Sequence, residues 1–305
     1  MEEHTHTEHK EKFNLGKFHD KHYKTLLLIP LILLIISVGY MFYFNSQTGD
    51  FISKDISLTG GTSITIQGSL DMNKINEDLS SQLEDLNTRS IYDIVTNEQK
   101  AIIVETITDG EETKEILEEY LGYALTEENS SFEFTGSSLS ESFYKQLLIA
   151  VLIAFLFMGG VVFLIFRSFV PSAAVIISAF ADILMTLALV NVLGIKMSSA
   201  GIVAFLMLIG YSVDTDILLT TRILKRTEGS INKRIASASK TGITMTLTSL
   251  LAITFALLIS KSFSVILTQI FTILVIGLAF DLINTWITNV SILKWHLEKK
   301  NEVHS

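Results

Sequence analysis

The sequence predicts a membrane-embedded bundle of six helices, with a small α+β domain inserted between the first and second helices. Hydrophobic residues make up 49% of the 305 residues and the mean hydropathy is +0.44, more apolar than an ordinary soluble domain. Six windows of about 20 residues are apolar enough to cross a bilayer. About a hundred polar residues separate the first window from the other five, and they predict the inserted domain.

The approximate windows are Thr25–Phe44, Gln146–Phe166, Phe169–Gly194, Ser198–Thr220, Thr241–Ser260 and Phe263–Leu293. The first window ends in aromatic residues, as at a membrane interface, whereas a signal peptide ends in a small-residue cleavage site. We therefore predict an uncleaved span at 25–44 between a tail at 1–24 and a polar domain at 45–145. Spans two to six occupy 146–293, and a second tail occupies 294–305.

Basic residues are concentrated on one side of this arrangement. The tails and the loops on their side of the membrane carry 15 of the 23 lysines and arginines, and the short loops opposite carry only Lys196 and Lys261. Because short cytoplasmic loops are enriched in Lys and Arg, both termini are predicted to be cytoplasmic. This predicts a multi-pass protein of the cytoplasmic membrane, with 45–145 outside the cell.

The polar domain shows alternating and helical periodicities in turn. They predict a strand at 56–66, a helix at 72–86, a hairpin of 91–95 with 101–107, a helix near 116–121 and a strand at 132–134. This order is the ferredoxin-like split motif. The domain carries 20 carboxylates and 6 basic side chains, which argues against nucleic acid or an anionic lipid surface as its partner.

Four aspartates lie inside the apolar windows: Asp182, Asp214, Asp216 and Asp281. A charged side chain at the bilayer centre costs about 2.5–3.5 kcal/mol on insertion scales, so such residues are functional candidates. Reversible protonation is the use to which a buried carboxyl group is best suited, and all four are candidates for a proton relay. For each one, a place near the end of a span or a hydrogen bond between helices remains the alternative explanation.

Small and hydroxyl residues form stripes on the third, fifth and sixth windows. Such stripes are common in membrane helix packing, so they predict only a bundle with a polar interior. Asp214 and Asp216 are about 200° apart around a helix and cannot line the same face. We predict that Asp214 faces the interior, because Gly210 lies one turn earlier, and that Asp216 faces a neighbouring helix or a partner subunit.

Other chemistry finds little support in the sequence. There is no cysteine, which excludes disulfides, thiolate catalysis and cysteine metal sites. His4, His6 and His9 are more simply explained as part of a solvated tail than as a metal site. No catalytic constellation is evident, so we expect no enzyme activity, no cofactor and no metal.

The segment 210–222, GYSVDTDILLTTR, contains Gly210, Tyr211 and Ser212 and resembles the fourth-helix signature of the SecF family, in its archaeal form. The similarity extends to LTGGT at 58–62, which includes Gly60 and Gly61, to 136–143 and to 167–172. It covers nearly the whole chain except about twenty residues at each end. Gly60 and Gly61 also permit a bulge or a close backbone approach where the first strand begins.

The resemblance implies half of a pseudo-symmetric unit of the resistance-nodulation-division (RND) type. Members of the family pair with SecD to give twelve spans, associate with the SecYEG translocon, and assist export of translocating polypeptides using the proton-motive force. Bacterial members more often read Asn-Asp-Thr where this chain has Asp214-Thr215-Asp216. The resemblance therefore implies that the bacterial SecF carboxylate falls on Thr215, whereas Asp214 matches the register of the SecD aspartate. Alternatives are an RND-type exporter of lipids or small molecules, an intramembrane aspartyl protease and a structural scaffold.

Overall fold

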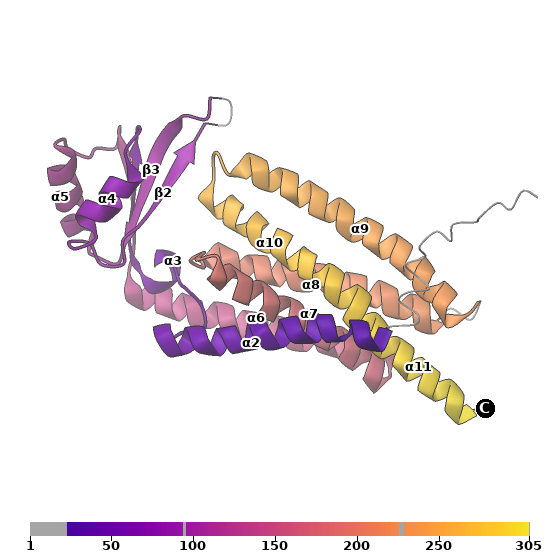
Figure 1. The fold of residues 1–305 in the computed structure, drawn as a ribbon. Coiled ribbons are helices and arrows are strands. Elements are labelled where there is room, and N and C mark those ends of the chain that lie inside the picture. Colours follow the sequence, from indigo (N-terminus) through magenta and orange to yellow (C-terminus); the bar gives the residue numbers. More distant parts are fainter. Residues whose placement is uncertain (1–22, 94–95, 226–228, 305) are drawn as a thin grey trace, which may run out of the picture.

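The protein is a long helical bundle with an α/β domain at one end, as Figure 1 shows. The structure is a computed structural model that describes residues 23–93, 96–225 and 229–304, with the backbone alone at 138 and 300–304. Most of the predicted N-terminal tail, with its histidines, therefore lies outside the described residues. Within them, six helices are long and apolar enough to cross a membrane, which confirms the predicted class of fold.

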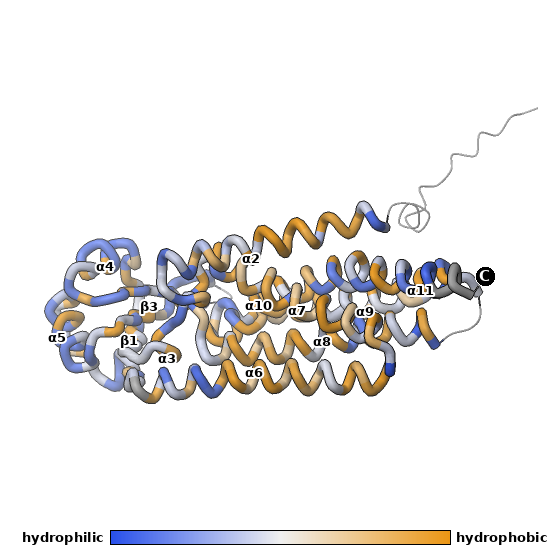
Figure 2. The backbone as a smooth tube through the Cα atoms, turned by 90° about the horizontal axis from the view of Figure 1, so that it is seen from below, coloured by the Kyte–Doolittle hydropathy of each residue, from blue (hydrophilic) through white to orange (hydrophobic). Residues whose placement is uncertain are grey.

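The helices of the bundle are longer than the apolar windows. They are α2 (Leu28–Thr48), α6 (Ser137–Phe166), α7 (Phe169–Val192), α8 (Ser199–Lys225), α9 (Ile231–Ser260) and α10 (Val265–Ile283). The last helix continues through a π-helical turn, η1 (Asn284–Asn289), into α11 (Val290–His304). The hydrophobic residues lie along the middle of the bundle and the polar residues at its two ends (Figure 2), as a bilayer requires.

The α/β domain is a four-stranded antiparallel sheet with the order β2-β3-β1-β4. Its elements are β1 (Gly61–Gln67), α4 (Met72–Leu79), β2 (Asn87–Tyr92), β3 (Gln99–Thr106), α5 (Gly110–Leu121) and β4 (Ser130–Thr135). The predicted ferredoxin-like order is confirmed. Side chains on one face of the sheet, including Ile64 and Val104, pack with α4 and α5 into the core of the domain. The other face is turned toward the bundle.

Local details of the sequence prediction were wrong in three places. Ile56 and Leu58 lie in a short helix, α3 (Ile56–Thr59), which Asp55 caps by accepting a hydrogen bond from the Ser57 amide at 2.9 Å. The helix α4 ends at Leu79, seven residues before the predicted end. The segment 221–240, which the apolar windows leave as a connection between the fourth and fifth spans, is largely helical, because α8 extends to Lys225 and α9 starts at Ile231.

Two glycines allow close backbone contacts where the α/β domain begins, Gly60 with the bundle and Gly61 with β3 of the same domain. Gly60 has a positive φ of 83°, and a Cβ added there would lie 2.4 Å from the Ser137 Cα at the start of α6. Gly61 has a φ of 143°, and its Cβ would lie 2.4 Å from the Thr106 carbonyl oxygen. Both glycines therefore permit the close backbone approach that the sequence predicted.

We expect Gly60→Ala to lower the thermal unfolding midpoint of the purified chain more than Gly68→Ala does. Gly68 also has a positive φ, 113°, but an added Cβ there would meet nothing within 4 Å. Both exchanges introduce backbone strain of about 1–3 kcal/mol, and only Gly60→Ala adds a clash with backbone atoms. Intrinsic fluorescence melting in detergent measures the difference. Equal shifts for the two variants would show that the contact with Ser137 is unimportant.

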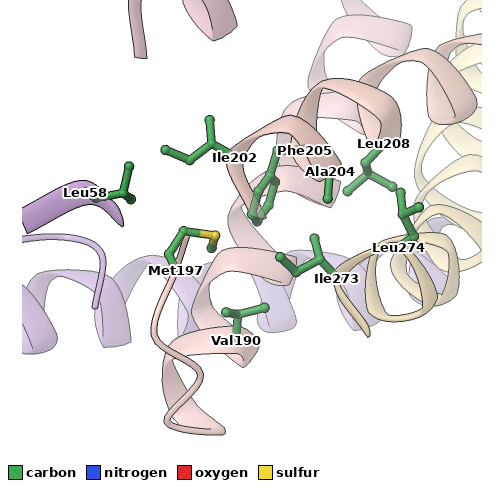
Figure 3. Close-up of a cluster of buried hydrophobic side chains, with 9 residues drawn as sticks. All are labelled: Leu58, Val190, Met197, Ile202, Ala204, Phe205, Leu208, Ile273 and Leu274. Atoms are coloured by element: carbon green, nitrogen blue, oxygen red, sulfur yellow. The ribbon is translucent and has the colours of Figure 1, made fainter. Parts of the chain in front are cut away.

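A cluster of apolar side chains fills the bundle between the α/β domain and its middle. Figure 3 shows this cluster, with Leu58 of α3 at one end and Leu208 and Leu274 at the other. Its buried members are Leu58, Val190, Met197, Ile202, Ala204, Phe205, Leu208, Ile273 and Leu274. We call this set of nine residues the apolar plug. Gly277 leaves room for it, because an added Cβ would lie 2.4 Å from a Leu208 methyl carbon.

Candidate functional site: a buried aspartate cluster

Three of the four candidate aspartates meet in the interior of the bundle. Asp182 comes from α7, Asp216 from α8 and Asp281 from α10, and each side chain is 0% exposed. On α8 and α10 the apolar plug lies between this cluster and the end that carries the α/β domain. Asp281 is twelve residues beyond Gln269, about 18 Å along α10. The aspartates are therefore deep in the bundle.

Asp182 is held by two donors from different helices. The Ser212 hydroxyl of α8 donates to its Oδ2 at 2.6 Å, and the Asn284 amide of η1 donates to its Oδ1 at 2.7 Å. One contact joins α7 to α8, and the other joins α7 to η1. Asp182 therefore fixes the relative positions of three helices as well as carrying an ionisable group.

Asp216 and Asp281 share a donor. The Thr285 hydroxyl lies 2.9 Å from Asp216 Oδ1 and 3.0 Å from Asp281 Oδ1, so it bridges the two carboxyl groups. Asp216 Oδ1 also accepts from the Asn289 amide at 2.7 Å and from the Ser178 hydroxyl at 3.5 Å. The Oδ2 atoms of both aspartates are buried and have no hydrogen-bond partner in the structure. Each leaves an oxygen at which a proton can be bound.

A π-helical turn positions three of the donors. In η1 the widened turn directs Asn284, Thr285 and Asn289 into the cluster, and all three side chains are 0% exposed. Such turns are rare and are often found at functional sites. Trp286 of the same turn fits against Gly242 of α9, where an added Cβ would lie 2.2 Å from the indole ring. The absence of a side chain at Gly242 thus allows α9 to pack closely against Trp286 of η1.

The electrostatics of the cluster favour bound protons. None of the ion pairs found among the described residues includes Asp182, Asp216 or Asp281. Three carboxylates close together in a low-dielectric interior repel one another, and burial penalises each charge. The donors around them stabilise negative charge on some of the oxygens. This arrangement can hold one or more protons and exchange them when water reaches it.

The predicted positions of Asp214 and Asp216 were wrong in their orientation. Asp214 is on the exposed side of α8, and a Cβ added to Gly210 would meet nothing within 4 Å. The sequence fixes only the angle between the two aspartates, and packing against α7 and η1 selects Asp216 for the interior. Asp281 therefore shares the Thr285 donor with Asp216, and Asp182 lies one turn of α7 beyond Ser178, which also donates to Asp216.

The other residues of the fourth-helix signature also lie partly on the inner side and partly on the exposed side of α8. Ser212 points inward to Asp182, whereas Tyr211 is 41% exposed on the same side of α8 as Gly210. Asn289 was missed, although it continues the stripe of Asp281 and Thr285 at four-residue steps. Among the described residues, no group of three or more His, Cys, Asp or Glu side chains could hold a metal ion.

Comparison with known proteins places the chain in a family. The family model described as "Protein export membrane protein SecD/SecF, C-terminal" matches residues 116–299. A curated SecF of Methanocaldococcus jannaschii is 40% identical over 288 residues, covering 91% of this chain and 96% of the relative. The chain belongs to the SecF family of protein-export membrane proteins.

Other SecF proteins from archaea agree with this placement. The relative from Methanothermobacter thermautotrophicus is 36% identical over 92% of this chain, and the one from Methanolacinia petrolearia is 34% identical over 90%. The predicted assignment to an archaeal-type SecF is thus confirmed.

The solved SecDF structure from Thermus thermophilus shares the fold. It superposes with a TM-score of 0.71 over 94% of this chain at 17% identity, and a second SecDF form gives 0.58 over 93%. This chain spans 39% of that SecDF chain, so the match covers one part of a longer protein. At this identity the likeness shows the fold alone.

Proposed function

We propose that this chain is the SecF subunit of a SecD–SecF complex that assists export of proteins across the cytoplasmic membrane. The buried cluster of Asp182, Asp216 and Asp281 would couple export to the proton-motive force by binding and releasing protons. The observation that carries this proposal is the set of three fully buried carboxyl groups, two of which share the Thr285 hydroxyl while the third is held by Ser212 and Asn284. Loss of proton-dependent export in an Asp216→Asn chain is its test.

The partners follow from the family. SecF relatives are named protein-export membrane proteins, and the Thermus SecDF is described as translocon-associated. For this chain we infer association with SecD, with the SecYEG translocon and with polypeptides in transit. The work is mechanical rather than catalytic, because a change of protonation shifts helix packing and no covalent chemistry is required. The protease and exporter alternatives gain no support from a specific contact.

The exposed side of α8 supports a contact with SecD. Val203, Met207, Gly210, Tyr211 and Asp214 follow one another at helical spacing on this side, and all five are exposed. We call this set the α8 face. An acidic group on a lipid-exposed helix is costly, and a partner helix with a hydrogen-bond donor removes that cost. Gly210 leaves space for such a helix to approach closely.

The orientation is proposed to be N-in and C-in, with the α/β domain outside the cell. Single cysteines in this cysteine-free chain test it at two exposed positions, Ser81 beyond α4 and Asn232 at the start of α9. We expect Ser81→Cys to react with a membrane-impermeant maleimide in intact cells, and Asn232→Cys to react only in inverted vesicles. The opposite pattern would reverse the orientation.

A further inference from the structure

A polar cavity lies between the α/β domain and the adjacent end of the bundle. Its volume is about 230 Å³, and its walls come from α3, from the open face of the sheet and from the first residues of α8 and α10. Ionisable residues on its walls are Asp55, Arg89, Glu105 and Glu133. The aspartate cluster lies on the other side of the apolar plug, so this cavity is a separate site.

Asp55 is a buried acid in this cavity with no cationic partner. It is 7% exposed, and none of the ion pairs among the described residues includes it. Its Oδ1 accepts from the Ser57 amide at 2.9 Å and from the Ser57 hydroxyl at 2.6 Å. Burial raises the pKa of Asp55 from its ordinary value of 3.8 to about 6; the Ser57 hydrogen bonds and the charge of Arg89 oppose this shift, and Glu105 adds to it.

The surrounding charges are already paired with one another. Glu105 of β3 binds Arg89 of β2 and accepts from the Asn87 amide at 2.8 Å. Next to Asp55 along the chain, Lys54 pairs with Asp50, and Lys196 of the α7–α8 loop pairs with Asp85. Glu133 of β4 lines the cavity and is exposed, and the uncharged Ser198, Ser199 and Gln269 come from the residue before α8, from α8 and from α10. Protonation is therefore the direct way for Asp55 to lose its charge.

Asp55 also lies within the hydrogen bonds that attach the α/β domain to the bundle. Its amide donates to the Met197 carbonyl at 3.0 Å, and the Ser199 amide donates to the Ser57 hydroxyl at 2.9 Å. The same short helix carries Leu58 into the apolar plug (Figure 3). A movement that opens this junction would therefore expose Asp55 to water and, at the same time, displace Leu58 from the apolar plug.

We propose that this cavity is a proton-binding vestibule, in which Asp55 takes up a proton from the outer side and thereby fastens the α/β domain to the bundle. The inference rests on the orientation and the proton-coupled role proposed above. Opening of the junction hydrates Asp55 and returns its pKa toward 3.8, so the closed junction binds the proton more tightly. The closed junction is therefore stabilised as the pH falls through about 6, and it is loosened as the pH rises.

Hydrogen exchange of the full-length chain in lipid nanodiscs measures how the stability of the closed junction depends on pH. The method detects open states even when their population is very small. The reporters are the Asp55 and Ser199 amides, corrected for intrinsic exchange, with the Ile102 amide of the sheet core as reference. Relative to pH 7.5, we expect their protection to rise about tenfold at pH 5 and about 60-fold at pH 4. The reference amide should not share this rise.

Asp55→Asn keeps a good helix cap but cannot titrate, so protection should be high and independent of pH. Asp55→Ser is a second variant that keeps a cap and should also abolish the pH dependence. Glu133→Gln removes a neighbouring acid of the same cavity and should keep the full rise. A wild-type chain without the rise, or an Asp55→Asn chain that retains it, would overturn the proposal.

The same measurement on Asp216→Asn separates this inference from the proposed function. That variant lacks a titrating group on the far side of the plug, and its junction should still tighten in acid. If export were independent of the proton-motive force while the junction kept its pH dependence, only the proposed function would fail. If export depended on Asp216 but protection of the junction amides did not change with pH, only the vestibule proposal would be overturned.

Discussion

Asp216→Asn is expected to abolish the proton-dependent part of protein export, reducing it to the level of membranes that lack this chain. The exchange removes a titrating group from the centre of the cluster and keeps the size of the side chain. Oδ1 can still accept from Thr285 and Asn289, and the new amide occupies the place of Oδ2, which has no partner. The fold and the association with SecD should therefore survive, and the loss should be specific to proton coupling.

The measurement is the uptake of a secretory protein into inverted vesicles, with and without a protonophore. Asp214→Asn is the matched control, because it makes the same chemical change two residues away on the exposed side of α8. We expect it to reduce export far less than Asp216→Asn does. Normal export with Asp216→Asn and none with Asp214→Asn would assign the chief titrating role to Asp214, the residue that the sequence predicted to face the interior.

Gly210→Phe is expected to prevent binding of SecD. The amount of SecD that co-purifies with the chain from native membranes should fall at least tenfold. An added Cβ at Gly210 meets nothing within 4 Å, so the chain itself can accept a larger side chain there. A phenyl ring would nevertheless hold a partner helix away from the α8 face and from Asp214. We therefore expect an unchanged melting temperature for the isolated chain.

Gly39→Phe provides the control for this exchange. Gly39 lies in α2, is exposed, and has the same open surroundings, but no acidic group lies on its side of the helix. This variant should recover SecD as well as the wild type does. Equal recovery with both phenylalanine variants would show that SecD binds elsewhere, and loss with Gly39→Phe alone would place the interface on α2.

Long regular patterns were predicted well because many residues repeat the same signal. The six membrane helices follow from uninterrupted apolar windows, and the order of the α/β domain follows from its alternating periods. Short elements were harder. Ile56 and Leu58 fit a strand by alternation, yet the Asp55 cap and contacts with the bundle make α3 helical. Four residues carry too little periodic signal to outweigh such tertiary contacts.

The sequence by itself determined that the chain crosses a membrane, that its interior is polar, and that Asp182, Asp214, Asp216 and Asp281 are candidate proton carriers. The tertiary structure decided which three of them meet. Helical geometry fixes Asp214 and Asp216 on different sides of α8, but the rotation of α8 depends on what packs against it. Ser178, Thr285 and Asn289 come from elements distant in the sequence, and their bonds to Asp216 set that rotation.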